Sequence, residues 1–515
     1  MNKHLKSCGL LVAASLLTLA SCNKANKNVI NFWTGFGQSM TTALENVLAD
    51  YKEQGLLKEG YDVVHTGQGG YDNLLSNITG SVSTRSYPQI AVAYPDHMAQ
   101  YEESKILTDL SNFIERDGVK LDSYYQDYLQ ECKEVKEGAI SGLPFNKSTE
   151  VLTTNKTFVE VLIALTASKT GDDKITGVPQ TWQEVDKFGT AAIKVLKELG
   201  AFNKVIMKNE AGEYKVYADK ASGELAGYVT VIDLTAVGEN DFRVLSWDSQ
   251  ANYFITGVRQ WNGVYTELTT DAKGNKVGVM RYKSKETAAM LSFMHKLFAK
   301  NILGVPSTFG EASYTSTPFK AYKTIFTVGS SAGVSNCVPA NNEDGTPKFE
   351  VEINTIPYNA DYPENKFVIS QGTNLVMLRN TNEESREETW KLLKTLSYDA
   401  TFNATFAKSS GYIPVTKDAV NSKLYQDYLK DETLTGTAKT MRDAVVLNFN
   451  VYKGEGSDWT QFVDPGFVGS SSIRKNIGTV MEAVRDAKDS DDNEAKWLEL
   501  LDSYYQLDKG YIPAE

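Results

Sequence analysis

The order of strands and helices near the N-terminus most restricts what this chain can fold into. Short apolar runs typical of buried strands occur at residues 29–33, 61–65 and 90–94. Apolar side chains recur at helical spacing over residues 40–51, and residues 74–78 begin a second helix. This β-α-β-α-β order predicts an α/β fold whose mostly parallel sheet is covered by helices on both faces.

The loops that follow these three strands share one chemistry. They combine glycines with aromatic rings and hydrogen-bonding groups, among them Trp33, Tyr71, Tyr94 and Asp96. In open α/β sheets, ligands bind beyond the carboxyl ends of the strands. We therefore predict that Trp33, Tyr71 and Asp96 contact a ligand.

The N-terminus has the features of a bacterial lipoprotein signal. Two lysines precede an apolar run at residues 9–20, which suits a signal-peptide core and is too short for a permanent membrane span. Small residues then lead into Cys22. We expect a signal peptide over residues 1–22, lipid on Cys22, a tether at residues 23–28, and an exported protein anchored to the bacterial membrane. An ordinary secretory signal with an incidental cysteine is the alternative.

Composition argues against several classes of function. Asp and Glu (65) outnumber Lys and Arg (53) without any basic block, so we expect no nucleic-acid partner. The chain has four histidines and no cysteine spacing typical of metal sites, and we expect neither a metal nor a cofactor. No phosphate-binding loop motif occurs, so the chain is not an ATP-hydrolysing subunit. Cys132 and Cys337 could form a disulfide or stay free.

A serine-hydrolase motif is present only in outline. Residues 329–333 match G-x-S-x-G, but turn-forming residues follow, and every histidine precedes Ser331. The motif requires a helix next and a histidine later in the chain. We therefore expect no enzyme. An exported glycosidase remains the alternative from another class, since any two carboxylates can meet in space, and a protein-binding adhesin is a third.

Helices predominate after residue 155. The clearest covers residues 181–200, with Thr181 as N-cap and Glu184 three residues later. Further helices are predicted at residues 285–301, 385–408, 473–488 and 495–505, and strands at residues 324–333 and 367–378.

Several segments resemble those of bacterial extracellular solute-binding proteins, most closely the glycerol-3-phosphate-binding and maltose-binding-like branches. The most specific are LPFNKSTEVLTTNK at residues 143–156 and SGYIPVTK at residues 410–417. The resemblance implies a periplasmic-binding-protein-like fold of two α/β lobes, joined by crossing strands, with a solute cleft between them. The lobes would comprise residues 29–145 with about 322–385, and residues 146–321 with about 386–515. It further implies a monomeric receptor that delivers its solute to the permease subunits of an ABC importer.

The same resemblance suggests which residues contact the solute. Transferred position by position, the family's contacts fall on Tyr71, Asp96, Ser148, Ser330 or Ser331, Gly372 and Tyr412. The arginine that pairs with phosphate in the glycerol-phosphate branch is replaced by Phe467. Lys147 could compensate as a point charge, although a surface lysine is the alternative.

The chemistry of the chain favours a sugar. Aromatic faces stack on sugar rings, and carboxylates accept hydrogen bonds from their hydroxyls. Trp247 and Asp248 offer both groups side by side, with Asn252 nearby. We expect a neutral sugar or oligosaccharide, with glycerol 3-phosphate or a glycerophosphodiester as the alternative.

Overall fold

The computed structural model describes residues 28–270 and 276–511. The expected signal peptide, the lipidation site Cys22 and nearly all of the expected tether lie outside these residues. Within them, no helix is both long and apolar enough to cross a membrane.

The N-terminal part folds as the sequence pattern predicts. Strand β1 pairs in parallel with β2 and β3, and helices connect the strands. The elements are β1 (Val29–Thr34), α1 (Gln38–Glu53), β2 (Asp62–Gly67), α2 (Tyr71–Gly80), β3 (Ile90–Ala93), α3 (Pro95–Glu103), α4 (Ser111–Arg116) and α5 (Gln126–Glu134). The buried residues of α1 are Ala43, Leu44, Val47, Leu48 and Tyr51, which pack on the sheet, whereas Met40, the first residue of the predicted spacing, is partly buried.

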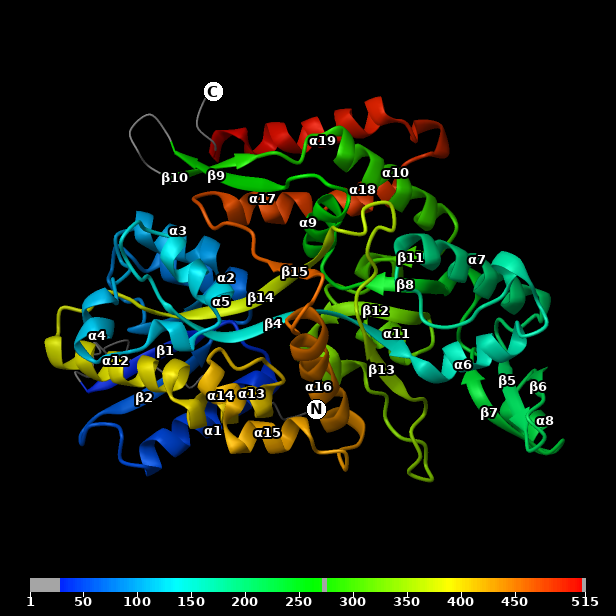
Figure 1. The fold of residues 1–515 in the computed structure, drawn as a ribbon, viewed down its shortest axis with the longest axis horizontal. Helices are drawn as coiled ribbons and strands as arrows, with labels where there is room; N and C mark the ends of the chain where they lie inside the picture. Colours follow the sequence, from blue (N-terminus) through cyan, green and yellow to red (C-terminus); the bar gives the residue numbers. More distant parts are fainter. Residues whose placement is uncertain (1–27, 271–275, 512–515) are drawn as a thin grey trace, which may run out of the picture.

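Two long strands cross the middle of the molecule. They are β4 (Leu143–Asn155), which is buried along its whole length, and β14 (Lys366–Met377). The two pair antiparallel, with a bulge between Thr373 and Asn374. In Figure 1 they run from the N-terminal half at the left to the green half at the right. Because β4 and β14 lie at the centre of one ten-stranded sheet, the two halves share a continuous backbone network. Eight of its strands follow the order β11-β8-β12-β4-β14-β3-β1-β2, and β13 and β15 pair with β4 and β14 off this path.

The second half is built on the far ends of these strands. Strand β12 pairs with β4 and β8, β13 with β4, and β15 with β14. Its elements up to β13 are α6 (Lys156–Leu165), α7 (Trp182–Glu198), β8 (Arg243–Trp247), α9 (Gln250–Gln260), α10 (Lys285–Ala299), β11 (Leu303–Gly304), α11 (Ser316–Lys320), β12 (Thr324–Ser330) and β13 (Val351–Asn354). The predicted capping box of α7 is confirmed, since Thr181 and Glu184 exchange hydrogen bonds.

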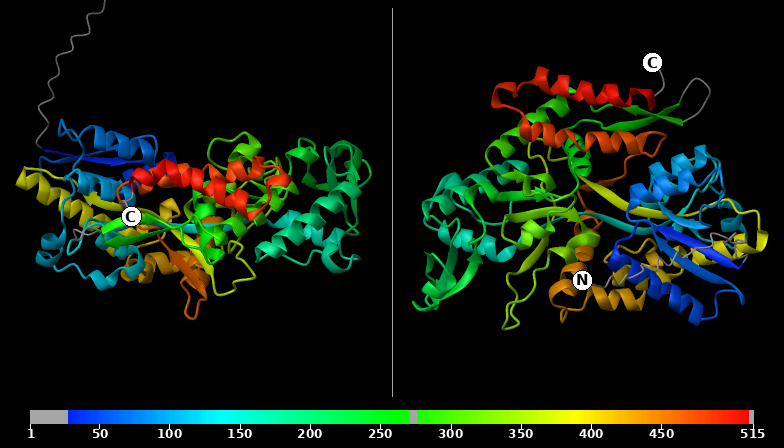
Figure 2. Two further views of the ribbon diagram at one scale, coloured as in Figure 1. Left: turned by 90° about the horizontal axis from the view of Figure 1, so that it is seen from above. Right: turned by 180° about the vertical axis from the view of Figure 1, so that it is seen from behind.

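Two small sheets are attached to the second half. A three-stranded sheet at its outer end contains β5 (Val205–Asn209), β6 (Tyr214–Tyr217) and β7 (Tyr228–Asp233), with α8 (Lys220–Glu224). A hairpin of β9 (Thr266–Thr270) and β10 (Lys276–Met280) lies beside the C-terminal helices (Figure 2).

The C-terminal third of the chain serves both halves. Its elements after β14 are α12 (Glu383–Tyr398), α13 (Ala400–Ser410), α14 (Lys417–Asn421), α15 (Lys423–Leu429), α16 (Gly436–Leu447), β15 (Trp459–Phe462), α17 (Ser470–Ile477), α18 (Val480–Asp486) and α19 (Glu494–Asp508). The predicted helix over residues 385–408 is interrupted at Asp399, whose carboxylate caps the N-terminus of α13.

The hydrophobic cores correct the expected lobe boundaries. Residues of α12 and α13 pack with the N-terminal sheet, whereas residues 325–356 pack with the second core, opposite to the expected division. The reason is strand pairing: β12 bonds to β4 and β8 in the second half, and the chain returns to the first half only along β14. Cys132 and Cys337 are free thiols, buried in different cores.

Candidate solute-binding cleft

A cavity of about 330 Å³ lies between the two halves. The first half contributes the N-terminal turns of α2 and α3. The second half contributes the N-terminal turn of α9, strand β9, the segment 463–466 and helix α17, and the crossing strand β14 forms part of the wall. Because both halves supply its walls, a molecule bound there touches both of them.

A second cavity of about 570 Å³ adjoins the first. The two share the side chains of Asp72, Asp96, Ser249 and Arg474. We call the two cavities together the interlobe cleft. The second cavity extends between α17, α9 and the loop at residues 306–314.

Backbone geometry brings the first half's side chains to the cleft. Gly70 precedes α2 with φ of 127°, a conformation that side-chain-bearing residues rarely adopt, and this turn presents Tyr71 and Asp72. Helix α3 begins directly after β3 with Pro95 in its first turn, followed by Asp96. Both carboxylates therefore lie at helix N-termini, where negative charge is favourable.

The second half approaches α3 very closely. A Cβ atom added to Gly466 would lie 2.4 Å from the carbonyl oxygen of Pro95, so this position accepts only glycine in the observed arrangement. Gln100 of α3 donates a hydrogen bond to Ser471 of α17 over 3.3 Å. These contacts close one side of the cleft.

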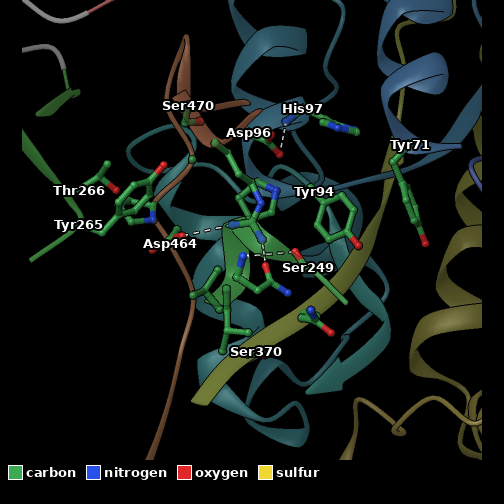
Figure 3. A pocket seen from close by; sticks show the side chains of 18 of the residues that line it. Tyr71, Tyr94, Asp96, His97, Ser249, Tyr265, Thr266, Ser370, Asp464 and Ser470 are labelled. Atoms are coloured by element: carbon green, nitrogen blue, oxygen red, sulfur yellow. Dashed lines mark hydrogen bonds and ion pairs between the residues drawn. The ribbon is translucent and has the colours of Figure 1, made fainter. Parts of the chain in front are cut away.

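Tyrosine rings form one face of the cleft. Tyr71 and Tyr94 pack edge to face with centroids 4.9 Å apart, and Tyr265 lies on the opposite side (Figure 3). Burial raises the pKa of Tyr71 well above its usual value, and the phenol groups of Tyr412 and Tyr94 add to that rise. The phenol of Tyr71 therefore stays protonated.

Arg474 occupies the centre of the cleft. Its Nη1 lies 3.3 Å from Oδ2 of Asp464, and its Nη2 donates to Oδ1 of Asn252. Burial raises the pKa of Asp464, and the positive charges of Arg474 and Arg259 oppose that rise. The Arg474 guanidinium is therefore already paired with a carboxylate of its own half.

Asp248 holds the loop at the edge of the second cavity. Its Oδ1 accepts from the backbone nitrogen and the hydroxyl of Thr315, each over 2.7 Å. Tyr314, the residue before Thr315, lines the second cavity with 67% of its surface exposed. Burial raises the pKa of Asp248 to about 6.

Carboxylates predominate in the lining of the cleft. Six acidic side chains line it against two basic ones, Arg474 and Lys475. The acidic residues are Asp72, Asp96, Asp248, Glu311, Asp464 and Glu482. The described residues contain no group of His, Cys, Asp and Glu side chains suited to hold a metal ion.

The structure brings some predicted site residues to the cleft and places others beside it. Tyr71, Asp96 and Asp248 line it. Tyr412 lies against Tyr71 behind the wall. Four further predicted contacts meet where the strands cross: the Ser330 hydroxyl donates to Ser148 over 3.1 Å, Ser331 accepts from the Thr149 backbone nitrogen, and Gly372 lies against the Asn146 carbonyl.

Two predicted aromatic contacts belong to the cores instead. Trp247 is fully buried, its ring packs against those of Trp182 and Tyr253, and its indole nitrogen donates to Glu150. Trp33 packs against the N-terminal core and does not line the cleft. A tryptophan at the end of a strand fits a core as well as a cleft, and only packing distinguishes the two.

Lys147 is neither a cleft residue nor a surface lysine. Its ammonium is buried and lies 2.7 Å from Oε2 of Glu131. It therefore cannot replace the missing phosphate-pairing arginine. The sequence analysis also missed Arg474, Asp464 and Tyr265, because isolated residues in the second half carried no motif that distinguished them from surface or core residues.

The sequence profile of the bacterial extracellular solute-binding protein family matches residues 46–433. The chain belongs to this family. No curated protein sequence matches the chain, but solved structures do. UgpB from Mycobacterium tuberculosis in complex with glycerophosphocholine superposes with a TM-score of 0.64 at 15% identity, covering 93% of this chain and 98% of that one.

Two sugar receptors superpose comparably. They are the GacH receptor of Streptomyces glaucescens, described with acarbose (TM-score 0.61, 13% identity, 94% and 99% covered), and MalE from Bdellovibrio bacteriovorus with maltotriose (0.59, 14%, 93% and 99%). At these identities the likeness shows the fold alone. The chain thus has the two-lobed fold of periplasmic binding proteins, and its family consists of bacterial extracellular solute-binding proteins.

Proposed function

We propose that this protein is the lipid-anchored receptor of an ABC importer and that it binds a neutral carbohydrate in the interlobe cleft for delivery to the membrane permease. The observation that supports this best is a cleft whose walls come from both lobes and carry four tyrosines and six carboxylates. A solute that contacts both lobes stabilises the closed arrangement through its differential affinity, and no chemical step is needed.

The chemistry of the lining fits a polyhydroxylated solute. Asp72, Asp96 and Asp248 can accept hydrogen bonds from hydroxyl groups, and charged acceptors make the stronger bonds. The exposed ring of Tyr314 can stack on the apolar face of a sugar ring. We propose Tyr71, Asp96, Asp248, Tyr314 and Arg474 as solute contacts.

A glycerol phosphodiester is the second candidate, because Arg474 supplies a guanidinium within the cleft. Bidentate arginine is the side chain best suited to bind phosphate. In this structure, however, the guanidinium is paired with Asp464 and surrounded by further carboxylates. An added phosphate would meet net negative charge, so we place the neutral sugar first.

A thermal-shift screen of the chain starting after Cys22 tests the proposal. The panel contains maltotriose, other oligosaccharides, monosaccharides, glycerol 3-phosphate and glycerophosphocholine. A solute at about 100 times its dissociation constant should stabilise the protein by roughly 2.7 kcal/mol. For lobes of this size, each kcal/mol raises the melting temperature by about 2–4 °C. A shift with sugars supports the proposal, and a shift with glycerol phosphates alone supports the second candidate.

The enzyme alternative is tested in the same samples. Any sugar that produces a shift is incubated with the protein and analysed for cleavage products. We expect the sugar to be recovered intact. Product that accumulates with time and with protein concentration would contradict the receptor assignment and favour a glycosidase.

A further inference from the structure

Glu150 is a buried carboxylate directly behind the cleft. It lies on the crossing strand β4 and is 1% exposed. Its Oε1 accepts two hydrogen bonds, from the Trp247 indole nitrogen over 3.1 Å and from Asn252 Nδ2 over 2.9 Å. Its Oε2 is buried without a hydrogen-bond partner among the described residues. Keeping a buried carboxylate ionised costs free energy. The groups that the charge of Glu150 holds in place therefore indicate its role.

Asn252 connects Glu150 to the cleft. Because its Nδ2 donates to Glu150, its Oδ1 is turned the other way, toward Arg474, from which it accepts a hydrogen bond. The Asn252 backbone is fixed as well, since its nitrogen donates to the Ser249 N-cap hydroxyl over 3.2 Å. A chain of hydrogen bonds thus runs from Glu150 through Asn252 to Arg474 and on to Asp464.

We propose that Glu150 is a positioning residue for the cleft: its carboxylate orients Asn252, Asn252 holds the Arg474 guanidinium toward the cavities, and neutralising Glu150 loosens Arg474. This role goes beyond the proposed function, because it applies to any solute that contacts Arg474.

The positioning of Arg474 depends on the charge of Glu150. An ionised acceptor strengthens the hydrogen bond that Asn252 donates, and the polarised amide becomes a better acceptor for Arg474. When Glu150 binds a proton, both bonds weaken. The guanidinium of Arg474 then depends more on Asp464 alone.

The environment of Glu150 places this change near neutral pH. Burial raises its pKa to about 7, while the hydrogen bonds from Asn252 and Trp247 and the charge of Arg474 oppose the rise and Asp248 adds to it. Tyr452, the other titratable group facing Glu150, stays a neutral phenol, because burial raises its pKa well above the usual value. Arg474 should therefore become looser as the pH falls through neutrality.

Labelling of Arg474 with phenylglyoxal, read by peptide mass spectrometry, tests the proposal without any solute. The label on Arg474 is divided by that on Arg281, whose exposed side chain pairs with Glu267, so that the reagent's own pH dependence cancels. We expect this ratio to be several-fold higher at about pH 6 than at about pH 8 in the wild type, on either side of the Glu150 pKa. In Glu150→Gln the ratio should be high and equal at both pH values.

Two variants serve as controls. Asn252→Ala removes the side chain that links Glu150 to Arg474. This variant should give a high ratio of Arg474 label to Arg281 label at both pH values. Tyr452→Phe alters another buried group beside Glu150 but leaves the Asn252 bond intact, so it should behave as the wild type. An equal ratio in wild type and Glu150→Gln, or a wild-type pH dependence that persists in Glu150→Gln, would overturn the proposal.

The indole signal of Trp247 gives a second measurement that a merely structural role of Glu150 would not change. Its N–H donates to the same oxygen, so its nitrogen-15 resonance, assigned with Trp247→Phe, should move with one inflection near pH 7. That inflection should be absent in Glu150→Gln, and its persistence there would contradict the proposal. If no solute in the thermal-shift panel binds, the proposed function fails, whereas these two measurements still decide the role of Glu150.

Discussion

The ammonium of Lys147 lies 2.7 Å from Oε2 of Glu131, and both side chains are buried. Asn374 of β14 donates to the same oxygen over 3.1 Å, so the pair ties the two crossing strands to α5. Burial raises the pKa of Glu131, and the charge of Lys147 opposes that rise. This pair therefore holds the crossing strands and α5 together rather than contacting solute.

Breaking the Lys147–Glu131 pair should be strongly destabilising. Lys147→Met leaves Glu131 buried without its cation, and we expect a loss of about 3–5 kcal/mol in the free energy of unfolding, measured by urea denaturation. The double variant with Glu131→Leu removes both charges and should recover most of this loss. If the double variant is as unstable as the single one, the pair's charges are not the cause.

Arg474→Gln should weaken solute binding at least tenfold. The substitution removes the central guanidinium, and a charged hydrogen bond of this kind contributes about 1.5–3 kcal/mol. Calorimetry with the solute found in the thermal-shift screen measures the change. Arg485→Gln, on the surface of α18, is the matched control and should bind as the wild type does. Unchanged affinity in Arg474→Gln would remove Arg474 from the site.

Asp464→Asn should shift the preference of the cleft toward anions. Asp464 is the carboxylate paired with Arg474, and its neutral isostere frees the guanidinium for another partner. We expect glycerol 3-phosphate to bind Asp464→Asn more tightly than the wild type, by calorimetry at low salt, where surface charges are least screened. Equal affinity would show that Asp464 does not exclude phosphate.

Tyr314→Ala should affect binding without affecting the fold. The ring is 67% exposed, so its removal costs little burial, whereas a stacked sugar would lose about 0.5–1.5 kcal/mol of contact energy. The dissociation constant should rise several-fold at unchanged melting temperature. The exposed Tyr511 offers a control, and Tyr511→Ala should leave affinity unaltered.

Glu150→Gln should become more stable than the wild type as the pH rises. Burial raises the pKa of Glu150 to about 7, so the folded protein keeps a proton that the unfolded chain releases at lower pH. The stability due to this proton is complete below the pKa of an unfolded glutamate and is lost as the pH rises through about 7.

The glutamine side chain of the Glu150→Gln variant does not titrate in this pH range. From about pH 5 to about pH 8, the free energy of unfolding of Glu150→Gln relative to the wild type should therefore increase, by an amount on the order of 3 kcal/mol. Urea denaturation across this range measures it. Glu224→Gln, at an exposed position on α8, should show no such trend.

The sequence by itself determined the parts of this protein that local pattern encodes. Strands at residues 29–33 and 90–94 and the helix between Gln38 and Glu53 follow from apolar spacing, since a side chain's face depends only on its position along its own element. Tyr71 and Asp96 could be predicted at the cleft, because parallel strands must end at the same edge of the sheet. The family was readable from segments at residues 143–156 and 410–417.

The tertiary structure decided the rest. Arg474 and Asn252 are far apart in sequence, and their contact depends on how α17 packs on α9. Trp247 packs in the core rather than at the predicted site, and Lys147 pairs with a buried carboxylate 16 positions away in sequence. Burial and pairing are properties of three-dimensional packing, so no local pattern in the sequence could show whether these side chains face the solute, the solvent or one another.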